Sequence, residues 1–527
     1  GGSPLPIYTL ESLFRPLPAA RRRVALGVFD GLHIGHRVVL SHTLDGDERA
    51  AVLTITHVPK AAAPLLSAEE EEQKLAQIGI DDLIRADLSL LRELTPQQFV
   101  DIVLCRLLGA CAVCCGFNYR FGKDRAGDLE TLRTLCAERG IAVTAVPAVM
   151  ADGAPVSSSR IRDAIAAGKM QEAARLLGYP YTLTAPVEHG FQLGRRLGFP
   201  TLNQSFPADR PLPRRGVYAS AVLVDGQTTF GVTNIGIRPT VHTAAAPLAE
   251  TWLPDVNEDL YGKSISVSPL FFLRPEQSFD SLEELSAAVH QNGEQARQLL
   301  SGDPSDPAVH AVLFDFDDTL HDRRVAFERF AYALLTRYFP DWDDSVRHER
   351  AHRMMCDNNG GYIESYESYF APFLREWDWP DGVDANTLTA TARRRFPDYV
   401  ALFPDTVAVL TELRRRGLRL GIITNGNSQM QNRKVDVSGL RTLVDLVVVS
   451  GDEGVHKPDG ELFRRAAARL GVPPHACLYV GDHPVNDIQG AQNGGMRPVY
   501  IDVHGQHADP PGVMRIAALS GLLPLLG

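Results

Sequence analysis

The stretch GRRLGFPTLN, from Gly194 to Asn203, is the segment around which the middle of this chain is organised. Two glycines and a proline interrupt any regular pattern, so the stretch predicts a tight loop. Thr201 and Asn203 follow the proline with one residue between them, which puts both side chains on one face of an extended segment. Hydroxyl and amide oxygens are hard ligands that suit Mg²⁺ and phosphate groups. An ordinary surface turn would also explain the stretch, so its meaning depends on the sequence around it.

The sequence downstream of this loop consists of short alternating runs that glycine and proline interrupt. Four such runs are YTLTAPVEHG, GVYASAVLVDG, TTFGVTNIG and KSISVSPLFFL. Their spacing predicts antiparallel strands in a small barrel over residues 181–300. A closing helix is predicted in SLEELSAAVHQNGEQARQLL, where Ser281 and Glu284 have the spacing of a capping box.

Three further runs carry a family resemblance. In chain order they are RRGVYA, GVTNIGIRPT and AETWLPDVNEDLYGKSISV. Together with GRRLGFPTLN they resemble the riboflavin kinase module over essentially its whole length. The resemblance implies that Thr201 and Asn203 hold Mg²⁺ and the ATP phosphates, in a loop that includes Gly194. It also implies that Arg274, in FFLRPEQSF, lies on the flavin side.

Glu250 is the candidate base of this module. By the same resemblance it takes the proton from the ribityl 5′-hydroxyl, since phosphoryl transfer needs positioning, charge neutralisation and a base. A lone glutamate is more often a solvated surface carboxylate, but its place eleven residues before Tyr261 in the E…DLYG frame favours the catalytic role. Two departures from the family pattern, Trp252 for histidine and Val256 for phenylalanine, predict altered packing around the flavin.

The N-terminal region contains the run VALGVFDGLHIGHRVVL. It predicts a buried strand from Val24 to Phe29, a glycine loop, and a helix that begins near Gly35. His33 and His36 flank Gly35 at the helix start, where backbone donors and the helix dipole favour an anion, and glycines allow a phosphate to come close. A strand–loop–helix junction with incidental histidines is the alternative.

The full GxFDGxHxGH pattern resembles the nucleotidylyltransferase signature. Two more runs, VSSSRIRDAIAAG and GFNYRFGKDRAGD, resemble the second phosphate motif and the flavin-side motif of the bacterial FAD synthetase branch. The resemblance implies a Rossmann-like domain over residues 5–180 in which histidines stabilise the ATP phosphates. The nucleotide or flavin contacts that it implies are Gly27, Asp30, Gly35, Asn118, Ser158, Ser159 and Arg160. The segment between His36 and Thr54 is short, which predicts a trimmed first helix, and TITHVP and Asn118 depart from the family pattern.

The third region follows SGDPSDPA (301–308), whose Pro, Asp, Ser and Gly content predicts a linker. AVLFDFDDTLHD, from Ala311 to Asp322, predicts a buried strand that ends in acidic residues, the position where α/β sheets place catalysis. Asp315 and Asp317 could divide nucleophilic attack on phosphorus and proton transfer between them. An acidic surface turn is the alternative.

The remaining motifs of this region follow in order. LGIITNGN contains Thr424 and Asn425, HKPDGELF contains Lys457, and LYVGDHPVNDIQGA contains Asp482 and Asp487. The set resembles haloacid dehalogenase-type (HAD) phosphatases over residues 309–527. The resemblance implies an aspartyl-phosphate on the first Asp, phosphate binding by the Thr, and charge neutralisation by the Lys. The Mg²⁺ ligands that it implies are Asp315, Asp317, Asp482 and Asp487, and the helical pattern at about 322–403 predicts an inserted cap.

Length and composition bound these expectations. At 527 residues the chain should contain about three domains, and its net charge of −11 argues against a general nucleic-acid or anionic-membrane binder. No apolar run is long enough to span a bilayer, and the seven cysteines fit a reducing compartment, so we expect a cytoplasmic protein. Cys111, Cys114 and Cys115 lie in an apolar, strand-like run, which favours small buried thiols over half a zinc site.

The sequence therefore predicts a multidomain α/β and β-barrel enzyme. A Rossmann-like nucleotidylyltransferase domain, a small antiparallel barrel and a HAD domain with a helical cap are expected. Small molecules are the expected partners: riboflavin, FMN, FAD, two ATP with Mg²⁺, and a phosphate monoester. For the phosphatase we expect 5-amino-6-(5-phosphoribitylamino)uracil, a phosphorylated riboflavin precursor, with FMN or another small ester as the alternative. A different class of function is a flavin-binding or regulatory protein in which the adenylyltransferase is inactive.

Overall fold

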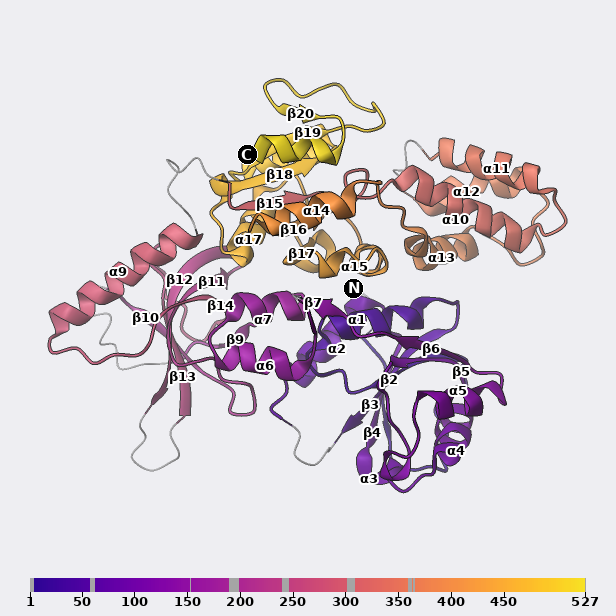
Figure 1. The fold of residues 1–527 in the computed structure, drawn as a ribbon, viewed down its shortest axis with the longest axis horizontal. Coiled ribbons are helices and arrows are strands. Elements are labelled where there is room, and N and C mark those ends of the chain that lie inside the picture. Colours follow the sequence, from indigo (N-terminus) through magenta and orange to yellow (C-terminus); the bar gives the residue numbers. More distant parts are fainter. Residues whose placement is uncertain are drawn as a thin grey trace.

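The computed structural model describes residues 4–56, 62–151, 153–188, 199–238, 246–300, 309–358, 363 and 365–526. Three six-stranded sheets follow one another along the chain, and Figure 1 shows the third unit lying along the first two. The predicted fold class is confirmed. The predicted linker, residues 301–308, lies outside the described residues.

The first sheet is entirely parallel, in the order β1-β4-β3-β2-β5-β6. Its strands are β1 (Ile7–Leu10), β2 (Arg22–Gly27), β3 (Arg49–Thr56), β4 (Asp82–Asp87), β5 (Ala110–Gly116) and β6 (Ala142–Val146). Helices α1 (Ile34–Ser41) and α2 (Ala68–Ile78) follow β2 and β3, and the helices after β4 and β5 are α3 (Leu88–Leu91), α4 (Pro96–Gln98), the π-helix Phe99–Leu107 and α5 (Leu129–Ala137). The chain turns to opposite sides of β2 when it forms β3 and β5, so the end of β2 is a switch point, where such sheets bind ligands.

The burial pattern explains why these residues form this sheet. Along β2, Val24 and Leu26 pack into the core on one side of the sheet, and Ala25 packs into the core on the other. Both faces are therefore buried, as in other parallel sheets. β2 ends two residues before the predicted end, because a single-turn helix begins at Asp30. Cys114 and Cys115 are buried in β5, as predicted, and burial raises the pKa of both thiols, whereas Cys111 is only partly buried.

A hairpin and two helices connect the first sheet to the second. They are β7 (Met150–Ala151), β8 (Ala154–Pro155), α6 (Ser158–Ala166) and α7 (Met170–Leu177). The second sheet is antiparallel, with the strands β9 (Leu183–Pro186), β10 (Thr201–Ser205), β11 (Gly216–Val224), β12 (Gln227–Arg238), β13 (Ala246–Trp252) and β14 (Ser264–Arg274). Its order is β10-β13-β12-β11-β14-β9.

The two edge strands of this sheet approach each other and nearly close a barrel. The fully buried Gln204 donates from its amide to the carbonyls of Ala185 and Ile265, at 2.8 and 2.9 Å. Helix α9 (Leu282–Leu300) follows the barrel. Ser281 caps it as predicted by accepting from the Glu284 N–H, but the Glu284 carboxylate accepts from Asp280 N–H, so the capping box is only half formed.

The third sheet is again parallel, in the order β17-β16-β15-β18-β19-β20. Its strands are β15 (Ala311–Phe314), β16 (Arg419–Thr424), β17 (Leu446–Val449), β18 (Cys477–Gly481), β19 (Arg497–Ile501) and β20 (Met514–Ile516). The helices around it are α14 (Thr406–Arg415), α15 (Ser428–Val437), α16 (Ser450–Glu453), α17 (Gly460–Leu470) and α18 (Gly490–Asn493). The neighbours β16 and β18 lie on opposite sides of β15, which makes the end of β15 a second switch point.

A separate helical unit is inserted after β15, as Figure 1 shows. It consists of α10 (Arg323–Tyr338), α11 (Asp344–Cys356), α12 (Tyr366–Glu376), α13 (Ala385–Arg395) and the single turn Phe396–Tyr399. Aromatic side chains fill its core, among them Phe327, Phe370 and Phe373. We call this unit the cap.

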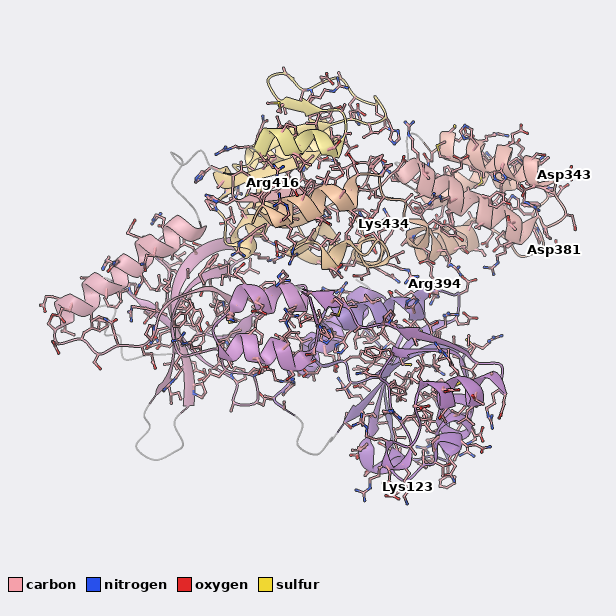
Figure 2. The ribbon with its side chains drawn as sticks, in the orientation of Figure 1. Lys123, Asp343, Asp381, Arg394, Arg416 and Lys434 are labelled. Atoms are coloured by element: carbon pink, nitrogen blue, oxygen red, sulfur yellow. The ribbon has the colours of Figure 1, made fainter. Side chains whose placement is uncertain are left out.

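The third unit is attached to the first through ion pairs. On α15, Arg433 pairs with Asp45 at 2.7 Å, and Asp436 accepts from Arg37 of α1 at 3.4 Å. In the cap, Arg394, labelled in Figure 2, pairs with Asp81 at 3.3 Å. Arg433 is 4% exposed, so its charge is buried at this interface. In the part of the chain that the structure describes, no helix is both long and apolar enough to cross a bilayer.

Candidate active sites

The first site lies at the carboxyl end of β2. Gly31 has a φ of +81°, a conformation that favours glycine, and this turn brings the chain into α1. His33 caps α1 because its Nδ1 accepts from the His36 N–H at 3.2 Å, and the two rings stack at 3.5 Å. A Cβ at position 35 would lie 3.1 Å from the His33 ring, so glycine keeps the stack possible.

The second phosphate motif lies against this loop. Ser158 Oγ donates to the Asp30 carbonyl at 2.8 Å, and Arg162 pairs with the Asp30 carboxylate. Arg160 donates to backbone carbonyls, Ala151 among them at 2.8 Å, while Ser159 is exposed on the first turn of α6. Sequence reasoning missed Arg162, although its place two residues after Arg160 in SSSRIRD was a usable signal.

Two other predicted residues of this site lie at strand ends. Gly27 ends β2, and Asn118 is exposed in the loop that follows β5. The structure therefore brings His33, His36 and Ser158 to the Asp30 loop, and it places Asn118 in the loop after β5, the strand that pairs with β2. Helix α1 is eight residues long, in keeping with the short segment between its histidines and β3.

Acid should destabilise this first site. Burial lowers the pKa of His33 to about 4 and that of His36 well below its usual value. In acid the unfolded chain therefore binds more protons at these histidines than the folded chain does. The contribution of the two neutral histidines to the free energy of unfolding is fully present above pH 6.5 and is lost as the pH falls from about 6.5 to about 4. The loss has a maximum slope of about 1.4 kcal/mol per pH unit for each such histidine.

Thermal unfolding at a series of pH values measures this effect. His33→Asn keeps an oxygen that can cap α1 and removes one titrating group, so it should lessen the acid destabilisation. His348→Asn, at a position of α11 that is 62% exposed and pairs with the exposed Asp344, should change the pH dependence much less. An equal acid loss in wild type and His33→Asn would contradict the prediction.

The second site lies where β10 pairs with β13. Asn203 stands directly opposite Glu250, and Asn234 of β12 stands opposite Glu250 on its other side. Two cavities, of about 360 and 260 Å³, flank β10, and Thr201 lines both. Asn203 is 6% exposed, and its buried Oδ1 accepts no hydrogen bond from the described residues. Such an orphaned oxygen fits a cation or a bound donor, because buried polar atoms otherwise have partners.

The larger of these two cavities has a mostly apolar lining with a few polar groups. Arg274 lines it and donates to the Asn292 side chain of α9 at 2.9 Å. Trp252 forms edge contacts with Phe199 and His290, and a Cβ at Gly293 would lie 2.6 Å from its ring. Apolar lining residues include Phe199, Val217, Val232, Trp252, Phe279 and Val289. Gly194 lies outside the described residues.

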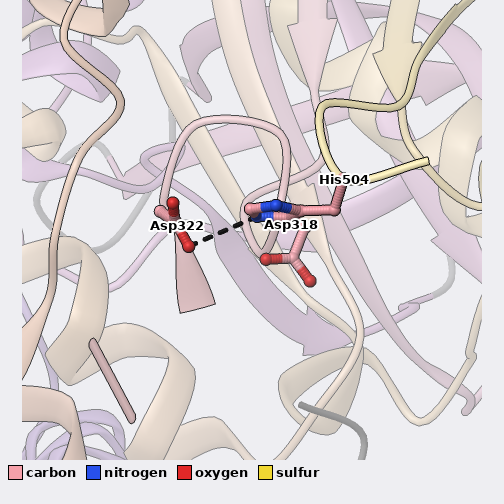
Figure 3. A group of neighbouring side chains, drawn as sticks. All are labelled: Asp318, Asp322 and His504. Carbon is pink, nitrogen blue, oxygen red and sulfur yellow. Dashed lines mark ion pairs between the residues drawn. The ribbon is translucent and has the colours of Figure 1, made fainter. Parts of the chain in front are cut away.

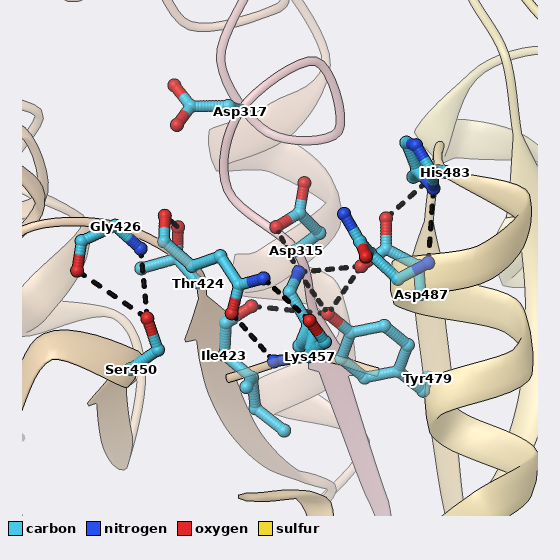
Figure 4. Close-up of polar contacts among 12 residues, drawn as sticks. Asp315, Asp317, Ile423, Thr424, Gly426, Ser450, Lys457, Tyr479, His483 and Asp487 are labelled. Atoms are coloured by element: carbon cyan, nitrogen blue, oxygen red, sulfur yellow. Dashed lines mark hydrogen bonds and ion pairs between the residues drawn. The ribbon is translucent and has the colours of Figure 1, made fainter. Parts of the chain in front are cut away.

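The third site lies at the switch point after β15, and Figure 4 shows its polar contacts. Lys457 donates to Asp315 and to Asp487 at 2.6 Å each, and Tyr479 OH lies 3.1 Å from the same ammonium. Burial works against the Lys457 charge, but the two carboxylates raise its pKa. Thr424 is buried at the end of β16, and the Asn425 side chain exchanges two hydrogen bonds with the Lys457 backbone, at 2.8 and 3.0 Å.

Three carboxylates form a group that suits a divalent cation. Single oxygens of Asp315, Asp482 and Asp487 all lie within 4.8 Å of one another. Burial and the neighbouring carboxylates raise the pKa of Asp315 to about 7 and that of Asp482 well above its usual range. Hard oxygen donors that repel one another fit Mg²⁺, which would neutralise them.

Mg²⁺ should therefore stabilise the third unit. Free Mg²⁺ at about a hundred times its dissociation constant should raise the unfolding temperature of this unit by about 5–10 °C. Asp482→Asn replaces a charged ligand by a neutral amide and removes part of the repulsion. Its unfolding temperature without Mg²⁺ should therefore be unchanged or higher, and its response to Mg²⁺ much smaller. Scanning calorimetry with and without Mg²⁺ measures both, and Asp381→Asn, at an exposed position of the cap, is the control. A full response in Asp482→Asn would contradict the prediction.

Asp317 does not lie with this cation group. Its carboxylate accepts from Lys434 at 2.9 and 3.1 Å and from Gln431 at 2.9 Å, and Figure 4 shows it apart from Asp315. Burial would raise its pKa, but the Lys434 charge, with His321 and Arg323, holds the pKa of Asp317 well below its usual range. The expectation that the Asp317 carboxylate binds metal therefore finds no support in this arrangement.

A second acidic group lies nearby and has a structural explanation. Figure 3 shows Asp318, Asp322 and His504, with the His504 ring 3.3 Å from Asp322. Asp322 caps α10 by accepting from two N–H groups at 3.1 Å, and Asp318 pairs with Arg323 at 2.9 Å. These carboxylates are already satisfied by protein donors.

The third site opens into a cavity of about 670 Å³. Besides the predicted residues, its lining consists of Arg323, Arg324, His483, Asn486, Gln506 and His507. Sequence reasoning missed these residues, and it missed Gln431 and Lys434 too. The two α15 residues follow the TNGN motif by one and two helical turns, but no local pattern connects them to Asp317.

Comparison with known protein families covers most of the chain. The FAD synthetase family model matches residues 18–160, the riboflavin kinase model matches residues 177–300, and the haloacid dehalogenase-like hydrolase model matches residues 309–495. The matches support the three corresponding enzyme activities, and they follow one another in the order of the three sheets.

Individual relatives agree with this assignment. A bifunctional riboflavin kinase/FMN adenylyltransferase of Listeria monocytogenes is 34% identical over 53% of this chain and 92% of that protein. Its Escherichia coli K12 counterpart is 35% identical over 52% of this chain and 92% of its own length. A crystal structure described as a macrolide-efflux protein from Streptococcus pneumoniae is similar with a TM-score of 0.51 and 28% identity, over 55% of this chain and 98% of that one. The chain belongs to the bifunctional riboflavin kinase/FMN adenylyltransferase family, and a haloacid dehalogenase-like hydrolase domain follows the family region.

Proposed function

We propose that this chain makes FMN and FAD and removes phosphate from a phosphorylated riboflavin precursor. In the kinase barrel, Glu250 takes the proton from the ribityl 5′-hydroxyl, which attacks the γ-phosphorus of ATP. Thr201 and Asn203 hold Mg²⁺ and the ATP phosphates. This assignment is supported by the buried Asn203 Oδ1, which accepts no hydrogen bond from the described residues. Mg²⁺ would neutralise phosphate charge at this position. Arg274 and the aromatic lining orient the flavin.

For adenylylation we propose that the loop after β2 binds ATP. His33 and His36 hold the phosphates together with Gly27, Gly35 and the first turn of α6, which carries Ser158, Ser159 and Arg160. Asp30 keeps the two motifs together through Arg162 and Ser158. Asn118 lies on the flavin side. The FMN phosphate attacks the α-phosphorus of ATP, and pyrophosphate leaves.

For the hydrolase we propose covalent catalysis by Asp315. Its carboxylate attacks the phosphorus, the ester oxygen leaves with a proton from Asp317, and water then cleaves the aspartyl-phosphate. Thr424 and Asn425 hold the phosphate, Lys457 neutralises charge, and Asp315, Asp482 and Asp487 hold Mg²⁺. Lys434 keeps Asp317 ionised in this conformation, so the pair must open before Asp317 can donate a proton.

The flavin cavity of the barrel and the cavity of the hydrolase site have different linings. This difference supports the uracil precursor as the substrate of the hydrolase. Phe199, Trp252 and Phe279 line the flavin cavity of the barrel, whereas the described lining of the hydrolase cavity contains histidine as its only aromatic residue type. Its Arg324, Asn486 and Gln506 offer hydrogen bonds to a ribityl chain and a uracil ring. FMN would place a large apolar ring system among these polar groups, which is unfavourable.

Phosphate release from 5-amino-6-(5-phosphoribitylamino)uracil, compared with FMN, tests this substrate assignment. The full chain is used without ATP, so that the kinase cannot restore FMN, and Asp315→Asn measures the background. We expect kcat/KM for the uracil compound to exceed that for FMN by at least about tenfold, a difference of about 1.4 kcal/mol in transition-state binding. Hydrolysis of FMN without hydrolysis of the uracil compound would overturn the assignment.

A further inference from the structure

A cavity of about 330 Å³ lies where all three units of the chain meet. We call it the junction cavity. Arg37 and Lys74 line it from the first unit, Tyr179 and Arg210 from the connection and the barrel, and Arg441 from the third unit. Its volume is sufficient for a small ligand. None of the residues assigned above to the three active sites lines it.

The lining of the junction cavity carries more positive than negative groups. Five cationic side chains line it, Arg37, Lys74, Arg210, Arg441 and Arg469, together with three acidic ones, Glu70, Asp452 and Glu453. Arg37 and Arg441 share one carboxylate, that of Asp436, at 3.4 Å and 2.5 Å. The cavity therefore has a surplus of buried positive charge, which a bound anion would neutralise.

Lys74 is the cation with the least compensation. No carboxylate of the described residues lies within ion-pair distance of its ammonium, which instead lies 3.6 Å from the centre of the Tyr179 ring. Burial and the nearby Arg37 charge lower the pKa of Lys74 to about 8. Arg210 is 9% exposed, and its Nε donates to no described partner, although its Nη1 donates to Glu70 at 2.8 Å.

The cavity is connected to two of the active sites by direct contacts. Tyr179 OH donates to the carbonyl of Gly31, inside the ATP loop of the first unit. On the other side, Arg441 donates to the Asn432 side chain at 2.8 Å, and Asn432 precedes Arg433 and Lys434 on α15. A ligand in the cavity would thus touch residues next to the adenylyltransferase loop and next to the Lys434–Asp317 pair.

We propose that the junction cavity binds a small molecule that carries a phosphate group, with Lys74, Arg37 and Arg210 as its cationic contacts. Guanidinium and ammonium groups are the preferred protein partners of phosphate. The chain releases inorganic phosphate and pyrophosphate and uses ATP, so free phosphate, pyrophosphate and a nucleotide share the required chemistry.

Affinity labelling with pyridoxal 5′-phosphate tests the proposal at the level of one residue. The neutral Lys74 amine attacks the aldehyde carbon, water leaves, and borohydride reduces the imine to a stable secondary amine that peptide mass spectrometry locates. Pyridoxal, which lacks the phosphate, is the matched reagent. At each lysine we divide the labelling by pyridoxal 5′-phosphate by the labelling by pyridoxal. We expect this ratio to be about tenfold higher at Lys74 than at Lys123, because one good phosphate contact raises affinity by about that factor.

Lys123 is a suitable control because it is 54% exposed and lies far from the junction, as Figure 2 shows. Because each lysine is compared with itself under the two reagents, the labelling ratio does not depend on how reactive its amine is. Equal ratios at Lys74 and Lys123 would overturn the proposal. Arg210→Gln should lower the Lys74 ratio without removing the lysine, provided that its unfolding temperature matches that of wild type.

Protection of the unsubstituted protein tests the same proposal without any variant. Inorganic phosphate, pyrophosphate and AMP are each added before labelling, with sodium chloride at matched ionic strength as the control. We expect at least one of them to reduce Lys74 labelling severalfold, and the strongest protector identifies the source of the phosphate. Labelling that falls equally with sodium chloride, or falls with none of them, would overturn the proposal.

Discussion

Asp315→Asn should lower phosphate-ester hydrolysis by at least about a thousandfold, or about 4 kcal/mol in activation free energy. The amide cannot attack phosphorus as the carboxylate does, and the change removes one of the three carboxylate charges available to a cation. Hydrolysis of p-nitrophenyl phosphate by the full chain measures the loss. The change does not introduce bulk, so the buried site should remain folded.

The same variant should leave both flavin reactions within about twofold of wild type, since additivity holds for distant sites. Formation of FMN from riboflavin and of FAD from FMN is followed separately. Asp381→Asn, an exposed position at the outer end of the cap in Figure 2, should change none of the three activities. Joint loss of hydrolysis and flavin synthesis in Asp315→Asn would show that the sites are not independent.

Glu250→Gln should lower riboflavin phosphorylation by about 10²–10⁴-fold, the usual contribution of a general base. Glutamine has the same shape and can still hydrogen-bond beside Asn203 and Asn234, but it cannot take the hydroxyl proton. Because the change removes only proton transfer, kcat should fall much more than the affinity for riboflavin. Steady-state phosphorylation and riboflavin fluorescence titration measure the two quantities.

Two comparisons make this prediction specific. FAD formation from added FMN should be unaffected in Glu250→Gln, because that reaction takes place in the first unit. Glu283→Gln, at the exposed beginning of α9, should leave phosphorylation unchanged. A Glu250→Gln protein that phosphorylates riboflavin at the wild-type rate would exclude Glu250 as the base.

The carboxylates of the third site show how far a motif can predict geometry. The family resemblance implied Asp315, Asp317, Asp482 and Asp487 as Mg²⁺ ligands, and the structure brings Asp315 together with Asp482 and Asp487. Asp317 instead lies against Lys434 and Gln431 of α15. The alternation of a strand predicts where Asp315 lies, but the partner of Asp317 depends on where a distant helix packs.

The sequence by itself determined the fold class of the three units and supplied most of the candidate residues of the three sites, because each motif lies within one strand–loop–helix or strand pair. The hydrophobic runs bury the strands. Asp30 and Asp315 then follow the ends of β2 and β15, and Thr201 begins β10 at the edge of the barrel sheet. Only the tertiary structure decided how the units contact one another. Arg433 pairs with Asp45 at the interface with the first unit, Lys434 pairs with Asp317, and Lys74 lines the junction cavity. The two ion pairs join residues that are 388 and 117 positions apart. They form because charges buried by docking must find partners, a requirement that no local pattern encodes.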